Sequence, residues 1–264
     1  MTTTARHAAS RTRPHLPAAL TTIGRIAAQL RADPRTIGII IVMPLVLVSL
    51  LWYAFVDVPV PPSGQAPFDT IGPMMLAILP MMLMFIVTSV TMLRERTSGT
   101  LERLLTTPLS RWNLLASYGA VFGFLGVAQA TLLGLLVLGP MGVEIAGNAW
   151  MLILIALLDA LVGVAFGLLA SAFARTELQA VQFMPVFIGP QLFLCGLFVP
   201  KEHMPDALGV VADFLPMTWA VDSVVDVVAN ETVSGATWGR LGLLAGIAVV
   251  FLFVASRSMP RQSR

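Results

Sequence analysis

Residues 150–174 read WMLILIALLDALVGVAFGLLASAFA, a run in which Asp159 is the only charged side chain. A helix needs about 20 mostly apolar residues to cross a bilayer, so this run predicts a transmembrane helix. The same test is met by five further segments, at 37–56, 71–93, 113–138, 181–199 and 236–256. These runs are continuous and lack the alternation that a membrane strand requires. The chain is therefore predicted to be an all-α integral membrane protein with six transmembrane helices.

The overall composition agrees with a protein whose solvent is largely lipid. Of the 264 residues, 57% are hydrophobic and only 11% are charged, whereas a soluble domain carries roughly 25% charged residues. A soluble enzyme and a disordered chain are thereby excluded. The formal net charge of +2 is too small to indicate a nucleic-acid partner.

The lysine and cysteine content excludes two kinds of site. Lys201 is the only lysine, and it follows Val199 and Pro200 rather than the glycine-rich turn of a phosphate-binding loop. We therefore expect no ATP site and no cofactor in this chain. Cys195 is the only cysteine, so neither an intrachain disulfide nor a cysteine metal cluster is possible.

The distribution of basic residues predicts the orientation of the chain. Fourteen of the 16 Lys and Arg residues lie before the first span, in the second and fourth connections, or after the last span, while the other connections are rich in Asp and Glu. By the positive-inside rule both termini are cytoplasmic, which agrees with an even number of spans in the plasma membrane. We expect a disordered cytoplasmic tail at 1–17, one transmembrane domain at 18–256 and a cytoplasmic tail at 257–264.

A short amphipathic helix is predicted before the first span, at 18–33. Its apolar positions recur at helical spacing, and Arg25 and Gln29 are among the polar residues on the opposite face. Such a helix is typical of the cytoplasmic membrane interface. The alternative is that the segment continues the disordered basic tail.

The connection after the second span is the most unusual stretch. Residues 94–115 read RERTSGTLERLLTTPLSRWNLL, in which leucines lie beside paired charges. Thr100 can cap a short helix, and Pro108 ends or redirects it. A short helix with exposed leucines and charges is suited to dock on a partner. The alternative is a solvated loop whose arginines only set the orientation of the chain.

This stretch resembles the signature of type-2 ABC export permeases, of the daunorubicin-resistance and nodulation-export kind. That signature reads Arg-Glu-x-x-x-Gly-Thr-Leu-Glu-x-Leu-x-x-x-Pro after the second span. The chain matches it at Arg94, Glu95, Gly99, Thr100, Leu101, Glu102, Leu104 and Pro108. Residues 174–182, 195–205 and 215–222 resemble later parts of the same family in the same order, so the resemblance covers nearly the whole chain.

The resemblance implies a permease that works with a separate ATPase. Two permease subunits, as a homodimer or as a pair of related permeases, would join two ATPase subunits that bind ATP and Mg²⁺. The segment 94–111 would be a cytoplasmic coupling helix seated on the ATPase, beside the 18–33 helix. The residues expected to dock the ATPase are Arg94, Glu95, Arg96, Gly99, Thr100, Leu101, Glu102, Arg103, Leu104, Leu105 and Pro108.

The segment 200–228 is too apolar for a plain external loop and too interrupted by proline for a span. The family resemblance implies short external re-entrant helices that dip back into the outer leaflet. Asp222 and Asp226 lie four residues apart on a predicted amphipathic helix. Two interpretations of this pair remain open, namely a solvated helix face and a metal or cation site.

Polar residues inside spans are costly and suggest a function. Asp159 is the only acid well inside a span, and it is expected to face a subunit contact, to line a polar path or to pair with Arg240. A purely structural role for it stays open. Soft methionine surfaces suit varied apolar ligands, although methionine is also an ordinary lipid-facing residue. The candidate substrate path consists of Met81, Met84, Gln182, Gln191 and Asp159.

The function expected from these observations is ATP-driven export of a hydrophobic or amphipathic compound, such as a drug or a lipid-like metabolite, with no covalent chemistry in this chain. Export of a lipid-linked glycan is the alternative within the family. From a different class, the alternative is a secondary transporter driven by an ion gradient. Such transporters carry internal repeats and broken helices at the membrane midplane, and the sequence shows no repeat.

Overall fold

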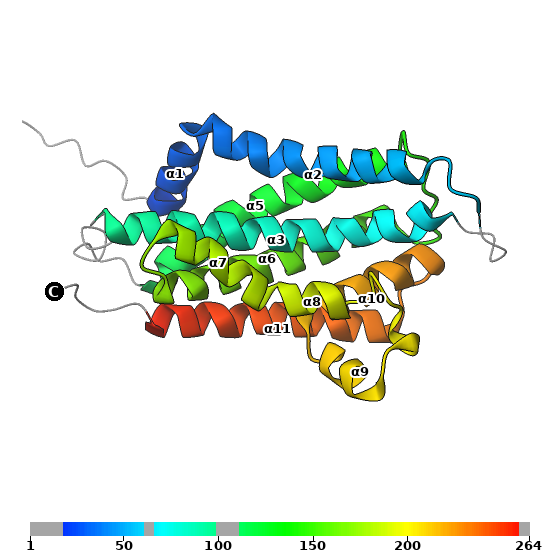
Figure 1. Cartoon of the computed structure of the whole chain (residues 1–264). Coiled ribbons are helices and arrows are strands. Elements are labelled where there is room, and N and C mark those ends of the chain that lie inside the picture. The colour runs from blue at the N-terminus through cyan, green and yellow to red at the C-terminus, as the bar shows by residue number, and fades with distance from the viewer. Residues whose placement is uncertain (1–17, 61–65, 99–110, 259–264) are drawn as a thin grey trace, which may run out of the picture.

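The computed structural model describes residues 18–60, 66–98 and 111–258. Every regular element in these residues is a helix, which confirms the all-α prediction, and most of the helices run along one common direction (Figure 1). In chain order they are α1 (Ala18–Arg31), α2 (Pro34–Phe55), α3 (Pro67–Thr97), α5 (Arg111–Leu138), α6 (Ala149–Phe173), α7 (Glu177–Phe187), α8 (Gly189–Leu194), the short 3₁₀ helix η1 (Lys201–His203), α9 (Asp206–Ala212), α10 (Pro216–Ala229) and α11 (Gly235–Ser258).

Five helices in the described part of the chain are long and apolar enough to cross a membrane. They are α2, α3, α5, α6 and α11, and they coincide with five of the six predicted spans. The chain is therefore a multi-pass membrane protein. Prolines lie inside α2 and α3, as is tolerated in membrane helices whose neighbours satisfy the freed backbone groups.

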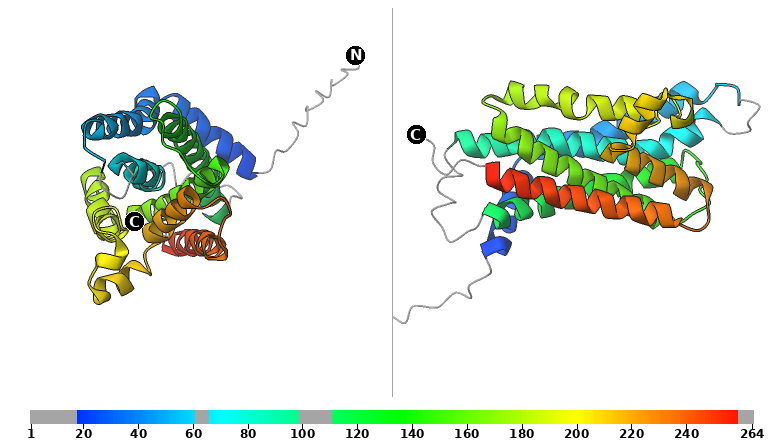
Figure 2. Two further views of the ribbon diagram at one scale, coloured as in Figure 1. Left: turned by 90° about the vertical axis from the view of Figure 1, so that its right-hand side faces the viewer. Right: turned by 90° about the horizontal axis from the view of Figure 1, so that it is seen from below.

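The remaining predicted span, 181–199, differs from the prediction because it is not one helix. It is divided between α7 and α8, which are interrupted at Ile188, and residues after Leu194 leave the helix. Together α7 and α8 extend about 27 Å at the rise of an α-helix, close to the roughly 30 Å of a bilayer core. They run along the bundle, with α7 beside α3 (Figures 1 and 2).

Short helices also form where they were predicted, between 200 and 228. α9 and α10 are together apolar enough for a span but meet at a bend of 90°, which fits a broken span or a re-entrant hairpin. α9 projects from the bundle (Figures 1 and 2). α10 instead packs into it, with buried residues on most of its turns, against α3, α6 and α11.

The centre of the bundle is the pairing of α3 with α6, the most extensive contact between any two described helices. A Cβ atom added at Gly163 would lie 2.3 Å from the carbonyl oxygen of Met81, and one at Gly167 would lie 2.5 Å from that of Phe85. Only glycine permits so close an approach of two backbones, as in other small-residue interfaces between membrane helices. The two helices are thereby held together without intervening side chains.

The amphipathic helix predicted at 18–33 is confirmed as α1. Ile26 is buried in a cluster with residues of α5. Asp33 then begins α2, because its carboxylate accepts hydrogen bonds from the amide of Thr36 at 3.2 Å and from its hydroxyl at 2.6 Å. The turn between α1 and α2 is thus fixed by a helix cap.

The two ends of the bundle differ in charge. One end holds α1 and the C-terminal ends of α3 and α11; we call it the basic end, because it carries Arg25, Arg94, Arg96 and Arg257. The acidic end is the opposite one, which holds η1, α9 and α10, with Glu202, Asp206, Asp213, Asp222 and Asp226. Figure 1 shows the basic end on the left and the acidic end on the right.

Candidate functional site

The candidate site lies at the basic end, where the last turn of α3 contains three consecutive charged residues. We call Arg94, Glu95 and Arg96 the charged trio; only Thr97 and Ser98 separate them from the segment 99–110. Successive residues of an α-helix point about 100° apart. The three side chains therefore leave α3 in three directions, and each of them contacts a different helix.

Glu95 connects α3 to α1. Its side chain is 6% exposed, and Oε1 accepts hydrogen bonds from Nη1 of Arg25 at 2.8 Å and from Nε2 of Gln29 at 3.3 Å. Arg25 and Gln29 lie one turn apart on the polar face of α1, and they are also hydrogen bonded to each other. A carboxylate this deeply buried needs such partners, since an unpaired buried charge is costly.

Arg94 connects α3 to α7. Its Nε and Nη2 atoms donate to the two carboxylate oxygens of Glu177 at 2.7 and 2.9 Å. This two-point geometry is the strong form of an ion pair, but both side chains are more than half exposed, which limits its contribution to stability. The hydrogen bond from Arg94 lowers the pKa of the Glu177 carboxyl.

Arg96 connects α3 to α6. It donates a hydrogen bond to the backbone carbonyl of Ser171 in the last turn of α6. The last carbonyls of a helix lack partners within the helix and attract cations. The charged trio thus connects the end of α3 to α7, α1 and α6.

The predicted docking residues divide into two groups. Arg94, Glu95 and Arg96 make contacts within the chain that the sequence did not predict. The signal for one of these contacts was present, since Arg25 and Gln29 formed the polar face of the predicted amphipathic helix. The other docking residues lie outside the described residues: Gly99, Thr100, Leu101, Glu102, Arg103, Leu104, Leu105 and Pro108.

The residues of the predicted substrate path occupy different environments. Met81 and Met84 are fully buried, in two separate clusters. Gln191 is buried, donating to the Phe187 carbonyl at 2.7 Å and accepting from the Met217 amide at 3.2 Å, whereas Gln182 is exposed. Asp159 is fully buried, and neither carboxylate oxygen has a hydrogen-bond partner among the described residues.

The expected pairing of Asp159 with Arg240 is wrong. Arg240 instead approaches Asp222, with Nη2 3.5 Å from Oδ2. Lys201 also approaches Asp222 at 3.9 Å and contacts Asp213. Lys201 and Arg240, the basic residues that the sequence places on this side of the chain, therefore converge on the half-buried Asp222, and Asp159 has no ion-pair partner among the described residues.

Asp222 and Asp226 do not form a joint cation site. The Asp226 carboxylate accepts hydrogen bonds from the hydroxyl of Ser234 at 2.8 Å and from that of Thr237 at 2.6 Å, at the beginning of α11. Ser234 caps α11, because its hydroxyl accepts from the amide of Thr237 at 3.2 Å, and Asp226 supports this cap, while Asp222 forms ion pairs. Across residues 18–60, 66–98 and 111–258, no group of three or more His, Cys, Asp or Glu side chains is arranged to hold a metal ion.

Comparison with known proteins gives a consistent set of relatives. A family model described as ABC-2 type transporter matches residues 19–229. The linearmycin resistance permease protein LnrN of Bacillus subtilis is 29% identical over 160 residues, which cover 61% of this chain and 41% of that protein. The probable multidrug ABC transporter permease YbhR of Escherichia coli is 27% identical over 169 residues, or 64% and 46%.

A second permease of Escherichia coli, the probable multidrug ABC transporter permease YbhS, is 29% identical over 140 residues, which cover 53% of this chain and 37% of that protein. The matched region therefore spans less than half the length of each of these three curated relatives.

Proposed function

This chain belongs to the family of ABC-2 type transporters, and from that premise we propose that it is the membrane permease subunit of an ATP-driven exporter. It moves a hydrophobic or amphipathic compound out of the cytoplasm or the inner leaflet. The names of two relatives, a linearmycin resistance permease and a probable multidrug permease, support an antibiotic or other drug-like cargo.

The energy comes from a separate ATPase, present in two copies, which binds ATP and Mg²⁺. The lack of a lysine-bearing phosphate loop in this sequence supports that division of labour. Two permease subunits form the membrane part. The chain is similar to two different permeases of one organism, YbhR and YbhS. A pair of related permeases therefore agrees with these similarities as well as a homodimer does.

The basic end faces the cytoplasm, as the positive-inside rule requires, in the plasma membrane. There the segment 99–110 docks on the ATPase. One observation carries this proposal: the charged trio, two residues before the segment, contacts α7, α1 and α6. When the ATPase pair closes on ATP, displacement of the docked segment moves the end of α3 and thereby the three helices tied to it.

The test replaces residues in the segment 99–110 that do not set orientation. Glu102→Ala removes a charged contact, and Leu105→Asp places a charge in an apolar docking groove, where an unpaired buried charge costs about 3–5 kcal/mol. Because each 1.4 kcal/mol changes affinity about tenfold, Leu105→Asp is expected to abolish retention of the ATPase. The measurements are co-purification with the ATPase and efflux from cells.

Matched controls separate docking from general damage. Glu231→Ala removes an exposed acid outside the segment, and Leu105→Met keeps an apolar side chain of similar size at the same position. Both controls are expected to retain the ATPase and efflux. Normal recovery of the ATPase and normal efflux with Glu102→Ala and Leu105→Asp would rule out the coupling role of this segment.

A further inference from the structure

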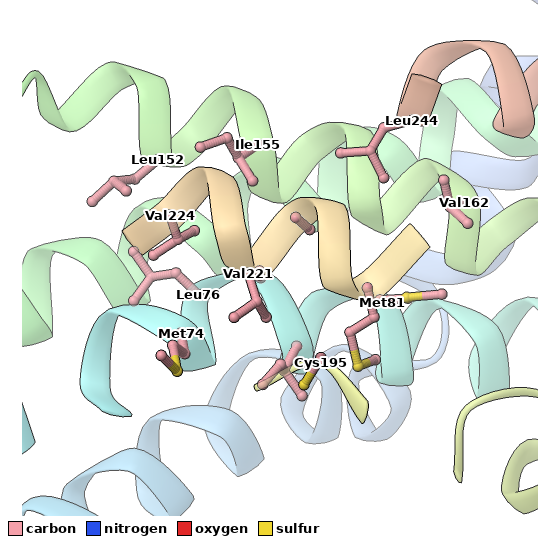
Figure 3. Packing of buried hydrophobic residues seen from close by; sticks show 14 of the residues in the cluster. Met74, Leu76, Met81, Leu152, Ile155, Val162, Cys195, Val221, Val224 and Leu244 are labelled. Atoms are coloured by element: carbon pink, nitrogen blue, oxygen red, sulfur yellow. The ribbon is translucent and has the colours of Figure 1, made fainter. Parts of the chain in front are cut away.

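Asp159 lies where four helices of the core meet. Its neighbours along α6, Ile155 one turn before and Val162 one turn after, belong to one buried cluster with Met81 of α3, Val221 of α10 and Leu244 of α11. Figure 3 shows this stretch of α6 passing over α10, with Leu244 beside it.

Its surroundings provide no counterion. Asp159 is 0% exposed, and both oxygens lack a hydrogen-bond partner in the described part of the chain. Arg240 and Lys201 are already paired with Asp222 and Asp213. A carboxyl group without partners in an apolar interior destabilises the fold, so its presence in a membrane helix points to a role that this conformation does not reveal.

α10 is the element that covers this region of α6, against which it packs. It does not cross the bundle, and a 90° bend joins it to α9, which projects from the bundle. The amides of Ala146 and Gly147 bond the carbonyls of Val228 and Val227 at 2.9 and 3.0 Å, which holds the far end of α10. Its first turn contains Thr218, whose buried hydroxyl also has no partner in the residues described.

Among the described residues no cationic side chain pairs with Asp159, so the counterion of an ionised carboxylate at this position has to come from outside them. We propose that Asp159 binds the positively charged group of the transported compound when α10 moves aside, so that the cargo class is amphipathic cations. This inference rests on the proposed export function. The fully buried Met81 beside the site offers an adaptable apolar surface for the rest of such a compound.

The experiment measures binding of tetraphenylphosphonium, a hydrophobic cation, to the full chain with its ATPase in lipid nanodiscs, after subtraction of empty nanodiscs. Tetraphenylborate, of nearly the same shape and opposite charge, is the matched probe. Asp159→Asn is expected to weaken cation binding about tenfold or more, because it removes a charge-assisted contact. Asp159→Glu is expected to retain binding, as is the control Asp222→Asn, and tetraphenylborate should show no dependence on Asp159.

Thermal stability distinguishes this role from a structural one. Asp159→Asn is expected to leave the midpoint of thermal unfolding unchanged or higher, since functional groups commonly cost stability. Three results would overturn the inference: no specific binding of tetraphenylphosphonium by the wild type, equal binding by Asp159→Asn, or a lowered unfolding midpoint for that variant.

Efflux of a neutral dye by the same complex separates the two proposals. ATP-driven efflux of the dye without Asp159-dependent binding of the cation would overturn the cation site alone. Cation binding that depends on Asp159, in a chain that neither retains an ATPase nor drives efflux, would support the cation site and overturn the exporter.

Discussion

The close contact of α3 with α6 is tested by the smallest possible change, Gly163→Ala. The added Cβ would lie 2.3 Å from the carbonyl oxygen of Met81 and 3.0 Å from its carbonyl carbon and Cα. Carbon–oxygen contacts between packed helices are ordinarily about 3.3 Å or longer, so the two helices must separate locally by about 1 Å. Overpacking of this kind costs about 1–3 kcal/mol.

The matched control is Gly246→Ala on α11, where an added Cβ meets nothing within 4 Å. In a helix this change favours folding by up to about 1 kcal/mol, because alanine is the better helix former. Gly163→Ala gains the same helix preference, so the two variants are expected to differ by the overpacking cost alone, about 1–3 kcal/mol, with Gly163→Ala the less stable.

The assay is unfolding of the purified chain in mixed micelles with increasing dodecyl sulfate, followed by circular dichroism. A difference between the two variants of less than about 0.5 kcal/mol, the usual size of a neutral surface change, would refute the argument that backbone contact at Gly163 holds α3 against α6.

Three further predictions follow from the described contacts. Glu95→Ala should lower the free energy of unfolding by about 1.5–3 kcal/mol, because it leaves Arg25 without its charged partner, whereas Glu177→Ala in the exposed pair should cost less than about 1 kcal/mol; equal effects in the same unfolding assay would contradict this. The hydrogen bond from the Thr36 hydroxyl lowers the pKa of Asp33. The wild type should therefore be more stable than Asp33→Ala above the ordinary carboxyl pKa of about 3.9 and should lose that advantage as the pH falls through the lowered value; a thermal-midpoint advantage that does not change with pH would contradict it. Reporter fusions at Gly64, Gly147 and Gly235 should report the outside, and fusions at Ser98 and Thr176 should report the cytoplasm. An odd number of membrane crossings would contradict the orientation predicted from the basic residues.

The sequence predicts those parts of the fold that the bilayer itself dictates. Five apolar windows correspond to five long helices, because a spanning segment must satisfy its backbone within a helix. The prediction of one continuous helix over 181–199 is wrong. Mean hydropathy measures only how apolar a window is, and it does not detect that Gly189 and Pro190 begin a new helix, α8. Proline has no amide to donate to the preceding turn and clashes with it.

The contacts of the candidate site were less predictable for a geometric reason. Arg94, Glu95 and Arg96 were expected to dock a partner protein, which stays a prediction; the contacts that they make within the chain, with Glu177, Arg25 and the end of α6, were not predicted. Which residues these three side chains contact depends on how α1 packs along α5 and on where α7 begins. Likewise, Arg240 meets Asp222 rather than Asp159 because of the rotation of α11 about its own axis, which composition does not encode.

α3 is held at two places along its length, and the number of residues between these two places cannot change by even one. One anchor is formed by the carbonyls of Met81 and Phe85, which lie in the spaces left by Gly163 and Gly167; the other is the charged trio. Inserting or deleting one residue between Phe85 and Arg94 turns one anchor about 100° relative to the other, so all three charged contacts would be lost while the glycine contact stays. Natural length variation in relatives of this chain should therefore fall in the connections between helices and be absent from residues 86–93.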